Sequence, residues 1–300
     1  MTAGRPWQPP SQRPWQTLAR RILRRHARSF AWAARLMPAG PRDDATVLYA
    51  WCRRCDDAVD HAADPETARA ALARLRADLD AVCGAGPLSD PVLDGLRDVF
   101  RRHGIPRRYA DELLDGMAMD LGPVRFARFA DLEIYCYRVA GTVGVMMAHI
   151  MGVRGGPALQ RAADLGIAMQ LTNICRDVVE DEQRGRIYLP ADLLGADPPS
   201  VARERTPVAV AVLLLIADRY YRSGEAGLGA LSAGCAVAIR AARLIYAEIG
   251  GVLARRGFDV HRGRAVVSPW RKLWLAWRAV VATASERLAG RADGRLRGWS

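Results

Sequence analysis

Residues 164–190 read DLGIAMQLTNICRDVVEDEQRGRIYLP, an apolar helical segment that ends in a group of acids. Residues four apart are neighbours on a helix surface, so Asn173, Asp177 and Asp181 are expected to project from one face. A like-charge pair at this spacing destabilises an isolated helix by ~0.2–0.5 kcal/mol, so a bound cation is the natural compensation. Hard oxygen donors of this kind suit Mg²⁺ or Mn²⁺. Gln170 lies nearly one turn before Asn173 and is placed to reach the same edge.

A second acidic cluster stands in YAWCRRCDDAVD, residues 49–60. Asp56 and Asp60 are again four apart, and Asp57 lies between them. A solvated helix face balanced by Arg53 and Arg54 would explain this cluster if it stood alone. With the second cluster in an otherwise apolar segment, a shared cation site on two facing helices is the better interpretation.

Arginines accompany both clusters. Arg53 precedes Asp57 by four residues and is expected to pair with it, and Arg176 adjoins Asp177. Arg184 and Arg186 directly follow the second cluster. Arginine suits bidentate contacts to phosphate, so acids, a divalent cation and arginines together indicate a diphosphate ligand.

The composition limits the alternatives. The chain has 300 residues, 50% hydrophobic content and a formal charge of +12, which is carried almost wholly by arginine because Lys272 is the only lysine. A basic protein can bind nucleic acid, anionic membranes or phosphorylated substrates. Interleaved basic and aromatic residues and zinc-finger spacing are missing, which disfavours nucleic acid.

The cysteines and the apolar runs point to a reduced protein without a membrane span. Six cysteines are scattered through predicted helices, and Cys52 with Cys55 is interpreted as small core residues rather than a redox pair. The first 16 residues are rich in proline and arginine where a signal peptide would be apolar. The longest apolar run, 208–217, is shorter than the ~20 residues of a transmembrane helix. We expect a soluble or peripheral protein.

Helical periodicity prevails along the chain, which predicts an all-α fold. Helices are expected near residues 16–37, 43–62, 65–83, 90–103, 106–121, 130–151, 156–182, 208–231 and 233–256. Breaks are expected at Pro41, 84–87, Pro106, 155–157 and 198–199. No Gly- or Pro-rich linker divides the middle, so we predict a disordered tail at 1–15, one domain at 16–285 and a flexible basic tail at 286–300.

The segment 135–153 is apolar or small around most of its circumference and belongs at the centre of a bundle. Gly141 and Gly144 lie inside it, where glycine costs up to about 1 kcal/mol relative to alanine. Close helix packing and room for a bulky apolar ligand both account for them.

Several stretches together resemble the squalene and phytoene synthase family of head-to-head isoprenoid synthases, and within it the bacterial phytoene type. They are HARSF (26–30), YAWCRRCDDAVD (49–60), GMAMDL (116–121), YCYRVAGTVGVMMAHIMGVR (135–154), the segment 164–190, and a basic region around Arg264 and Lys272. The resemblance covers roughly residues 20 to 275 in family order.

The resemblance implies a prenyltransferase with an isoprenoid-synthase helical bundle around a central cavity. It would condense two geranylgeranyl diphosphates through a cyclopropyl (prephytoene) diphosphate into phytoene, using two to three Mg²⁺ or Mn²⁺ ions and no NADPH. The implied metal ligands are Asp56, Asp60, Asn173 and Asp177, completed by Asp181. The implied diphosphate contacts are Arg53, Gln170, Asn173, Arg176, Tyr188 and Arg264. The implied catalytic residues are Tyr49, Arg53, Asp56, Asp60, Asp177, Asp181 and Tyr246. The expected pocket walls are Phe30, Tyr135, Ala140, Val143 and Ala162.

Other readings stay open at this point. A dehydrosqualene, presqualene diphosphate or squalene synthase would share these motifs while using two farnesyl diphosphates. A helical, membrane-associated partner protein without activity is an alternative of another class. Trp270, Trp274 and Trp277 stand among arginines in a segment that fits either a membrane interface or packing on the bundle. We expect a cytoplasmic protein that associates peripherally with the inner face of the membrane. Its product would pass to a carotenoid desaturase.

Overall fold

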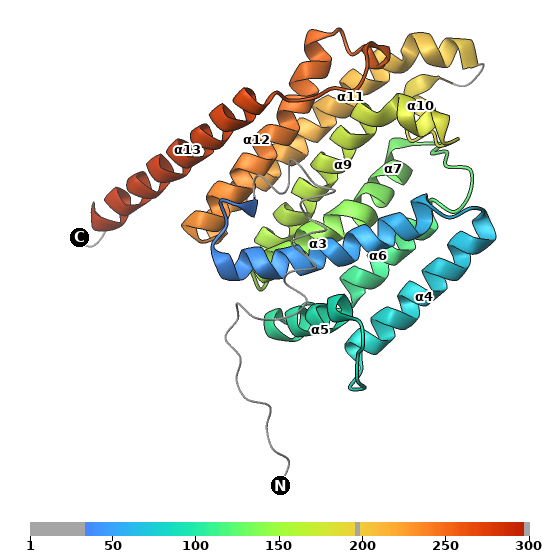
Figure 1. The fold of residues 1–300 in the computed structure, drawn as a ribbon. Coiled ribbons are helices and arrows are strands. Elements are labelled where there is room, and N and C mark those ends of the chain that lie inside the picture. Colours follow the sequence, from blue (N-terminus) through green and yellow to red (C-terminus); the bar gives the residue numbers. More distant parts are fainter. Residues whose placement is uncertain (1–33, 196–198, 297–300) are drawn as a thin grey trace.

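The computed structural model describes residues 34–195 and 199–296, and these form a bundle of helices (Figure 1). Within this part of the chain the only β interaction is an isolated parallel bridge between Arg125 and Ile187. The predicted all-α class is confirmed. Phe30, the HARSF stretch, the tail at 1–15 and most of the predicted helix 16–37 lie outside the described residues.

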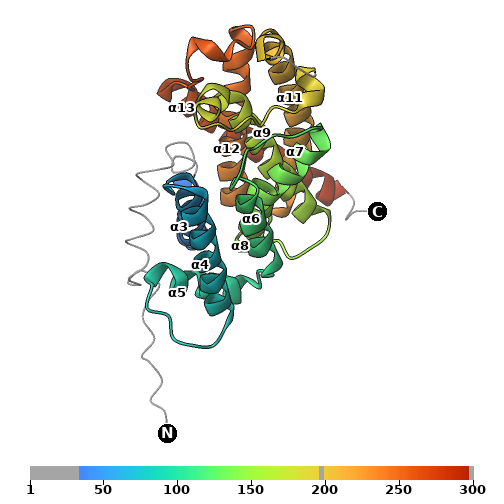
Figure 2. The same ribbon diagram turned by 90° about the vertical axis from the view of Figure 1, so that its right-hand side faces the viewer.

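The helices follow one another with short connections (Figures 1 and 2). In the first half they are α3 Ala39–Asp60, α4 Pro65–Cys83, α5 Pro91–His103, α6 Arg108–Ala118, α7 Phe129–Cys136, η2 Tyr137–Gly141 and α8 Thr142–Ile150. In the second half they are α9 Pro157–Gln183, α10 Ala191–Leu194, α11 Pro199–Ala226, η3 Leu228–Ala230, α12 Ala233–Arg255, η4 Val260–Arg262 and α13 Pro269–Leu296.

Local signals account for many helix ends. Asp64 and Asp90 accept hydrogen bonds from the first backbone N–H groups of α4 and α5, and a proline follows each cap. Gly104 ends α5 in the left-handed conformation. These ends agree with the sequence to within one or two residues.

Two proline signals were misjudged. Pro41 does not break the chain but lies in the first turn of α3, where a missing N–H costs nothing. The predicted start at residue 208 was wrong, because α11 begins at Pro199 and continues through Pro207. A proline inside a helix can bend it without ending it.

The predicted helix at 130–151 consists of three elements. The middle one, η2, is a π-helix in which the Thr142 N–H donates to the carbonyl of Tyr137, five residues earlier. Such turns hold one residue more than an α turn and occur frequently at functional sites. Amphipathic periodicity cannot reveal one extra residue in an apolar segment.

The glycines of this segment allow close packing against α9. A Cβ on Gly144 would lie 2.3 Å from the carbonyl oxygen of Ala162, and one on Gly166 of α9 would lie 2.2 Å from that of Ala140. Both distances are shorter than any real contact, so the two backbones meet only because side chains are missing there. Close packing accounts for Gly144, which also lines the central cavity, so both interpretations hold at this glycine.

The buried residues form two large clusters. One gathers side chains of α3, α4, α5, α6 and α8 around Leu48, Trp51 and Leu113, and the other gathers α7, α9, α11 and α12 around Leu171, Leu213 and Ile245. A cavity lined from both clusters lies between them. The fold thus places an apolar space at the centre of the bundle.

Helix α13 packs along α12 (Figure 1) through Ala241, Ala276 and Ala279. Buried Arg240 joins the two helices: it donates to Thr283 Oγ1 at 2.8 Å and contacts Glu286 at 2.6 Å. The helix continues to Leu296, through the predicted domain boundary at 285. Within the described residues, no helix is both long and apolar enough to cross a bilayer.

Candidate functional site

Two cavities meet inside the bundle. The larger, of about 580 Å³, is mainly apolar, and the smaller, of about 280 Å³, is lined chiefly by charged and polar side chains. Their shared lining residues are Asp56, Met117, Val139, Gln170, Asn173 and Arg176. One end of the apolar cavity therefore borders the polar one.

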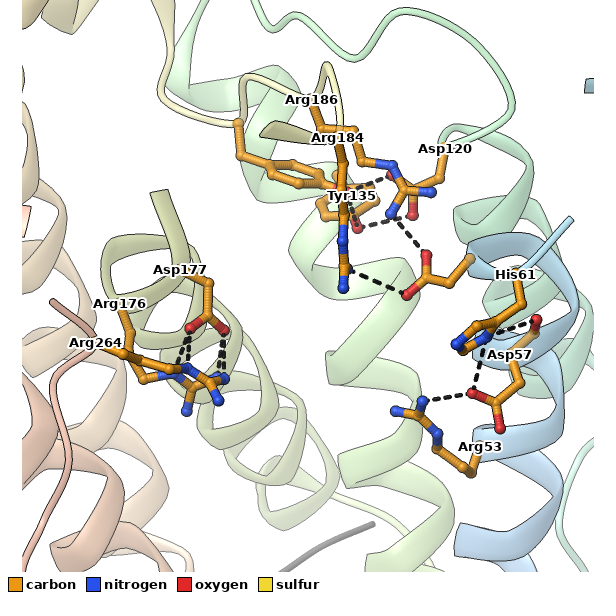
Figure 3. Close-up of polar contacts among 12 residues, drawn as sticks. Arg53, Asp57, His61, Asp120, Tyr135, Arg176, Asp177, Arg184, Arg186 and Arg264 are labelled. Atoms are coloured by element: carbon orange, nitrogen blue, oxygen red, sulfur yellow. Dashed lines mark hydrogen bonds and ion pairs between the residues drawn. The ribbon is translucent and has the colours of Figure 1, made fainter. Parts of the chain in front are cut away.

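Helix α3 supplies the first wall of the polar cavity. Asp56 and Asp60 both line it, as the four-residue spacing predicted. The Arg186 Nη1 lies 2.7 Å from Asp60 Oδ1, and the Arg184 Nη1 lies 3.8 Å from Asp60 Oδ2. These two arginines follow the second cluster in sequence but neutralise the first (Figure 3).

Asp57 has a different environment from its neighbours. It pairs with Arg53, as predicted, and its Oδ1 lies 3.4 Å from His61 Nδ1 (Figure 3). Neither Asp57 nor Arg53 is among the residues that line the two cavities. The structure therefore does not bring Arg53 to either cavity, where the sequence predicted a diphosphate contact.

Helix α9 supplies the opposite wall, with Asn173, Asp177 and Asp181 all lining the polar cavity. The helix is kinked at Asp177, whose φ of −105° and ψ of 15° are not helical. Adjacent residues of a regular helix do not face each other, but here the Asp177 carboxylate meets the guanidinium of Arg176. Arg264, from the loop after η4, binds the same carboxylate (Figure 3).

An amide pair lies beside this wall. Asn173 Nδ2 donates to Gln170 Oε1 at 3.3 Å, so Gln170 reaches the edge that the sequence predicted. The Oδ1 of Asn173 is buried and has no hydrogen-bond partner among the described residues. A buried oxygen without a partner costs about 1–3 kcal/mol, which a cation would relieve.

A hydrogen-bonded triad that the sequence did not predict closes the cavity between the walls. Asp120, just after α6, accepts from Tyr188 at 2.7 Å and from Tyr135 at 3.0 Å (Figure 3). Tyr135 was expected at the wall of the apolar pocket, but it lines the polar cavity instead. Asp120 stands alone at a helix end, so spacing could not identify it.

The carboxyl groups of the site differ in pKa. Burial raises the pKa of Asp56 to about 7, an effect that Arg53 opposes and Asp60 reinforces. Burial and the nearby Asp177 raise the pKa of Asp181 to about 7. Burial works in the same direction at Asp177, but Arg176 and Arg264 outweigh it and hold that pKa below the usual value. At neutral pH the site therefore holds carboxyls of unequal charge.

The apolar cavity is lined by small and flexible side chains. The expected wall residues Ala140, Val143 and Ala162 all line it, as do Met147 and Met169. Tyr49 and Tyr246 line the same cavity, and burial raises the pKa of both phenols, to about 12 for Tyr49. Both tyrosines therefore remain neutral there.

The carboxylates do not converge in this state. Among the described residues, no three His, Cys, Asp or Glu side chains are grouped closely enough to hold one metal ion. Asp60 and Asp177 face arginines instead. The donors surround one cavity, but two of them are engaged.

Comparisons with known proteins find relatives over most of the chain. The family model described as squalene/phytoene synthase matches residues 23–271. A 15-cis-phytoene synthase of a Paracoccus species is 43% identical over 286 residues, covering 91% of this chain and 93% of that protein. A phytoene synthase of Pseudescherichia vulneris is 38% identical, covering 95% of this chain and 98% of that protein. The crystal structure of a dehydrosqualene synthase in complex with ligand superposes with a TM-score of 0.82 at 28% identity, over 90% of this chain and 96% of that one.

Proposed function

This chain belongs to the squalene/phytoene synthase family, and on that premise we propose that it condenses two geranylgeranyl diphosphates head to head into phytoene. The observation that carries the proposal is the junction of the two cavities, where a mainly apolar space ends against carboxylates and arginines. Such a junction suits a substrate with a long hydrocarbon tail and a diphosphate head.

The first half-reaction breaks the C1–O bond of one substrate, and diphosphate leaves with the electron pair. The C1 cation joins the C2–C3 double bond of the second molecule, and loss of a proton closes a cyclopropane that still carries one diphosphate. Arg176 and Arg264, which line the cavity at this end, are placed to hold the departing diphosphate.

The second half-reaction breaks the remaining C1–O bond. The ring rearranges, and loss of another proton leaves the central double bond of phytoene. The released diphosphate, held beside the cation, is the proposed proton acceptor. Tyr49 and Tyr246 present neutral rings to the cavity, and the face of an aromatic ring stabilises positive charge.

The walls of the apolar cavity exclude water. Ala140, Val143, Met147 and Met169 bring no hydroxyl group or bound water to the reacting carbons. Their packing keeps the reacting carbons in a space of low polarity, so capture by water is suppressed. The small side chains at 140 and 162 leave room for the longer, twenty-carbon chain.

The donor set fits divalent cations. Within residues 34–195 and 199–296, Asn173 Oδ1 is a buried oxygen without a partner, and carboxylate oxygens of Asp56, Asp60, Asp177 and Asp181 surround the same cavity. These five residues would hold Mg²⁺ or Mn²⁺. When bound, the ions would act as Lewis acids on the diphosphate oxygens and so favour its departure.

The deciding experiment identifies the product. Purified protein is incubated with Mg²⁺ and either geranylgeranyl or farnesyl diphosphate, with and without NADPH, and the hydrocarbon is analysed by mass spectrometry. We expect phytoene from the geranylgeranyl substrate, independent of NADPH. A product formed only from farnesyl diphosphate, or an NADPH requirement, would overturn the proposal. Asp56→Ala and Asp177→Ala should abolish diphosphate release while the helical circular-dichroism signal persists.

The proposal extends to the location of the enzyme. Its product is a hydrocarbon, and α13 presents Trp270 and Trp277 to solvent, 80% and 61% exposed. Arg271 and Arg278 lie over the ring of Trp274, with Cζ 4.3 and 4.8 Å from its centroid. Tryptophan beside arginine favours an anionic membrane interface, so we place the enzyme at the inner face of the membrane, where a carotenoid desaturase would take its product.

A further inference from the structure

The Asp177 carboxylate is fully occupied by its own arginines. Arg176 contacts both oxygens, through Nε on Oδ1 at 2.7 Å and Nη2 on Oδ2. Arg264 does the same, with Nε 2.8 Å from Oδ1 and Nη2 3.1 Å from Oδ2. A carboxylate offers about four lone-pair sites, and these four hydrogen bonds use all of them.

We propose that Arg264 is a gating residue, which holds Asp177 until diphosphate arrives and then exchanges the carboxylate for the diphosphate, so that metal and diphosphate enter together. This inference rests on the proposed function, because it assigns an order to events at that site. It goes beyond the binding role by giving Arg264 a second partner, the Asp177 carboxylate, before the ligands bind.

Arg264 is better able to move than Arg176. Its side chain is 53% exposed, against 17% for Arg176, and it comes from a loop between η4 and α13 rather than from a helix. It also lines the apolar cavity, at the end where the diphosphate head would lie. Arg176 is fixed by α9 and by the kink that turns Asp177 towards it.

The exchange is favourable only when both ligands are present. A cation alone would have to displace a guanidinium fork from a carboxylate that is only 19% exposed, and would stand beside two positive charges. A diphosphate offers the displaced Arg264 guanidinium an equally good bidentate hydrogen-bond acceptor. Its charge also offsets that of the arginines and the cation. The binding of metal and of diphosphate should therefore be positively coupled.

The first cluster has a related arrangement. Arg186 holds Asp60 at 2.7 Å, with Arg184 nearby at 3.8 Å. On each wall, one potential metal ligand is thus paired with an arginine. This explains why the acidic clusters face one cavity without their carboxylates converging in the described structure.

The test measures binding of the metal alone separately from binding of the metal–diphosphate complex. Calorimetry measures the affinity of Mn²⁺ alone and of the preformed Mn²⁺–diphosphate complex for the wild type and for Arg264→Gln. We expect Arg264→Gln to bind Mn²⁺ alone roughly five- to tenfold more tightly, and the complex roughly tenfold more weakly, within the range of typical coupling factors. The opposite signs are the signature of a residue that competes with one ligand and binds the other.

Arg262→Gln is the matched control. Arg262 carries the same charge two residues earlier but pairs with Asp259 at 3.2 Å. Its loss reports the general effect of one charge, which should be less than twofold on both affinities because the side chain is exposed. If Arg264→Gln folds poorly, Arg264→Lys is the second variant, because lysine keeps the charge but cannot make the bidentate contact of a guanidinium. It should shift both affinities in the same directions by smaller factors.

Two outcomes would overturn the inference. If Arg264→Gln binds Mn²⁺ alone no more tightly than Arg262→Gln does, while the complex is weakened, then Arg264 only binds diphosphate and does not gate the metal. If the complex binds equally well to both variants, Arg264 does not take up diphosphate. In either case a wild type that still makes phytoene keeps the proposed function intact, whereas a wild type that binds no Mn²⁺–diphosphate and makes no hydrocarbon removes both.

Discussion

Asp56 is held in an environment that opposes its own charge, and this has a consequence for stability. Its folded pKa of about 7 exceeds its ordinary value of 3.8, so the folded state retains a proton that the unfolded state loses between these pH values. The contribution of Asp56 to stability therefore falls as pH rises from about 4 to about 7 and stays low above that. The ionised Asp56 carboxylate is available to the site but lowers the free energy of unfolding.

Asp56→Asn is expected to stabilise the ligand-free protein at pH 8 by an amount on the order of 2–4 kcal/mol, because the amide is not ionised. The gain should be smaller at pH 5, where the wild type is already protonated when folded. Urea unfolding at the two pH values measures it. Asp57→Asn is the control: it breaks the pair with Arg53 and should give no gain. An Asp56→Asn gain that is equal at both pH values would contradict the argument.

Contacts within a helix were predictable from spacing, as Arg53 with Asp57 and Gln170 with Asn173 demonstrate. Contacts made by the tertiary fold were not. Arg186 and Asp60 are 126 residues apart, and nothing in either motif indicates that they meet. Asp120 is likewise joined to Tyr188 only because the segment after α6 runs beside the segment after α9, where the Ile187 N–H donates to the Val124 carbonyl.

At the scale of elements, the contact between α8 and α9 depends on one missing side chain. Gly144→Ala would place a Cβ 2.3 Å from the Ala162 carbonyl oxygen, so the helices must separate. We expect a loss of about 1–3 kcal/mol in the free energy of unfolding, as for other overpacked contacts. Chemical denaturation measures the change.

Gly40→Ala is the matched control for that substitution. Gly40 is also helical, in the first turn of α3, but an added Cβ there meets no atom of the described residues within 4 Å. Alanine should be neutral or stabilise by up to about 1 kcal/mol through helix propensity. Equal effects of the two substitutions would show that propensity, and not the close approach, governs residue 144.

The attachment of α13 depends on Arg240. Its side chain is 3% exposed and reaches Glu225 of α11 at 2.6 Å as well as Thr283 and Glu286 of α13. Arg240→Met should destabilise the protein by about 3 kcal/mol, since it leaves buried polar groups unpaired. Backbone amides of α13 should then exchange hydrogen faster than in the wild type, while the exchange of α9 amides should change less.

Arg255→Met serves as the comparison. Arg255 pairs with Glu248 at 2.8 Å but is 61% exposed, so its removal should cost less than about 1 kcal/mol. Unchanged hydrogen exchange in α13 of Arg240→Met would mean that the apolar contacts with α12 hold it without the arginine.

For the whole molecule, the absence of a linker correctly indicated a continuous bundle, although the division at 15 and 285 remains a prediction. The sequence could not indicate that the buried residues would divide into two clusters around a cavity. Apolar periodicity marks which face of a helix is buried, but it is the same for a face that packs on a neighbour and for one that lines a pocket. Met147, which is buried and also lines the cavity, illustrates this.

The membrane proposal is tested on the complete chain. Trp270→Glu combined with Trp277→Glu should reduce co-sedimentation with anionic liposomes several-fold, because both rings are exposed and would enter the interface. Leu215→Glu is the control, since Leu215 is 69% exposed but lies on α11. Equal losses would indicate that any exposed apolar residue contributes, and no loss in either would show that α13 is not the anchor.

The π-helix η2 also determines which kinds of genetic change this enzyme can tolerate. Each residue of an α-helix turns the chain by about 100°, and η2 holds one residue more than a regular turn would. Deleting a single codon within 137–141 would let the segment relax into a continuous α-helix with all its backbone hydrogen bonds made. Because η2 completes its turn with one residue more than an α turn, the deletion would leave α7 and α8 in nearly the same relative orientation, with Tyr135 still facing Asp120. Deletion of one codon here should therefore preserve both the fold and the contact between Tyr135 and Asp120, whereas the same deletion inside a regular α-helix would turn every residue beyond it by about 100°.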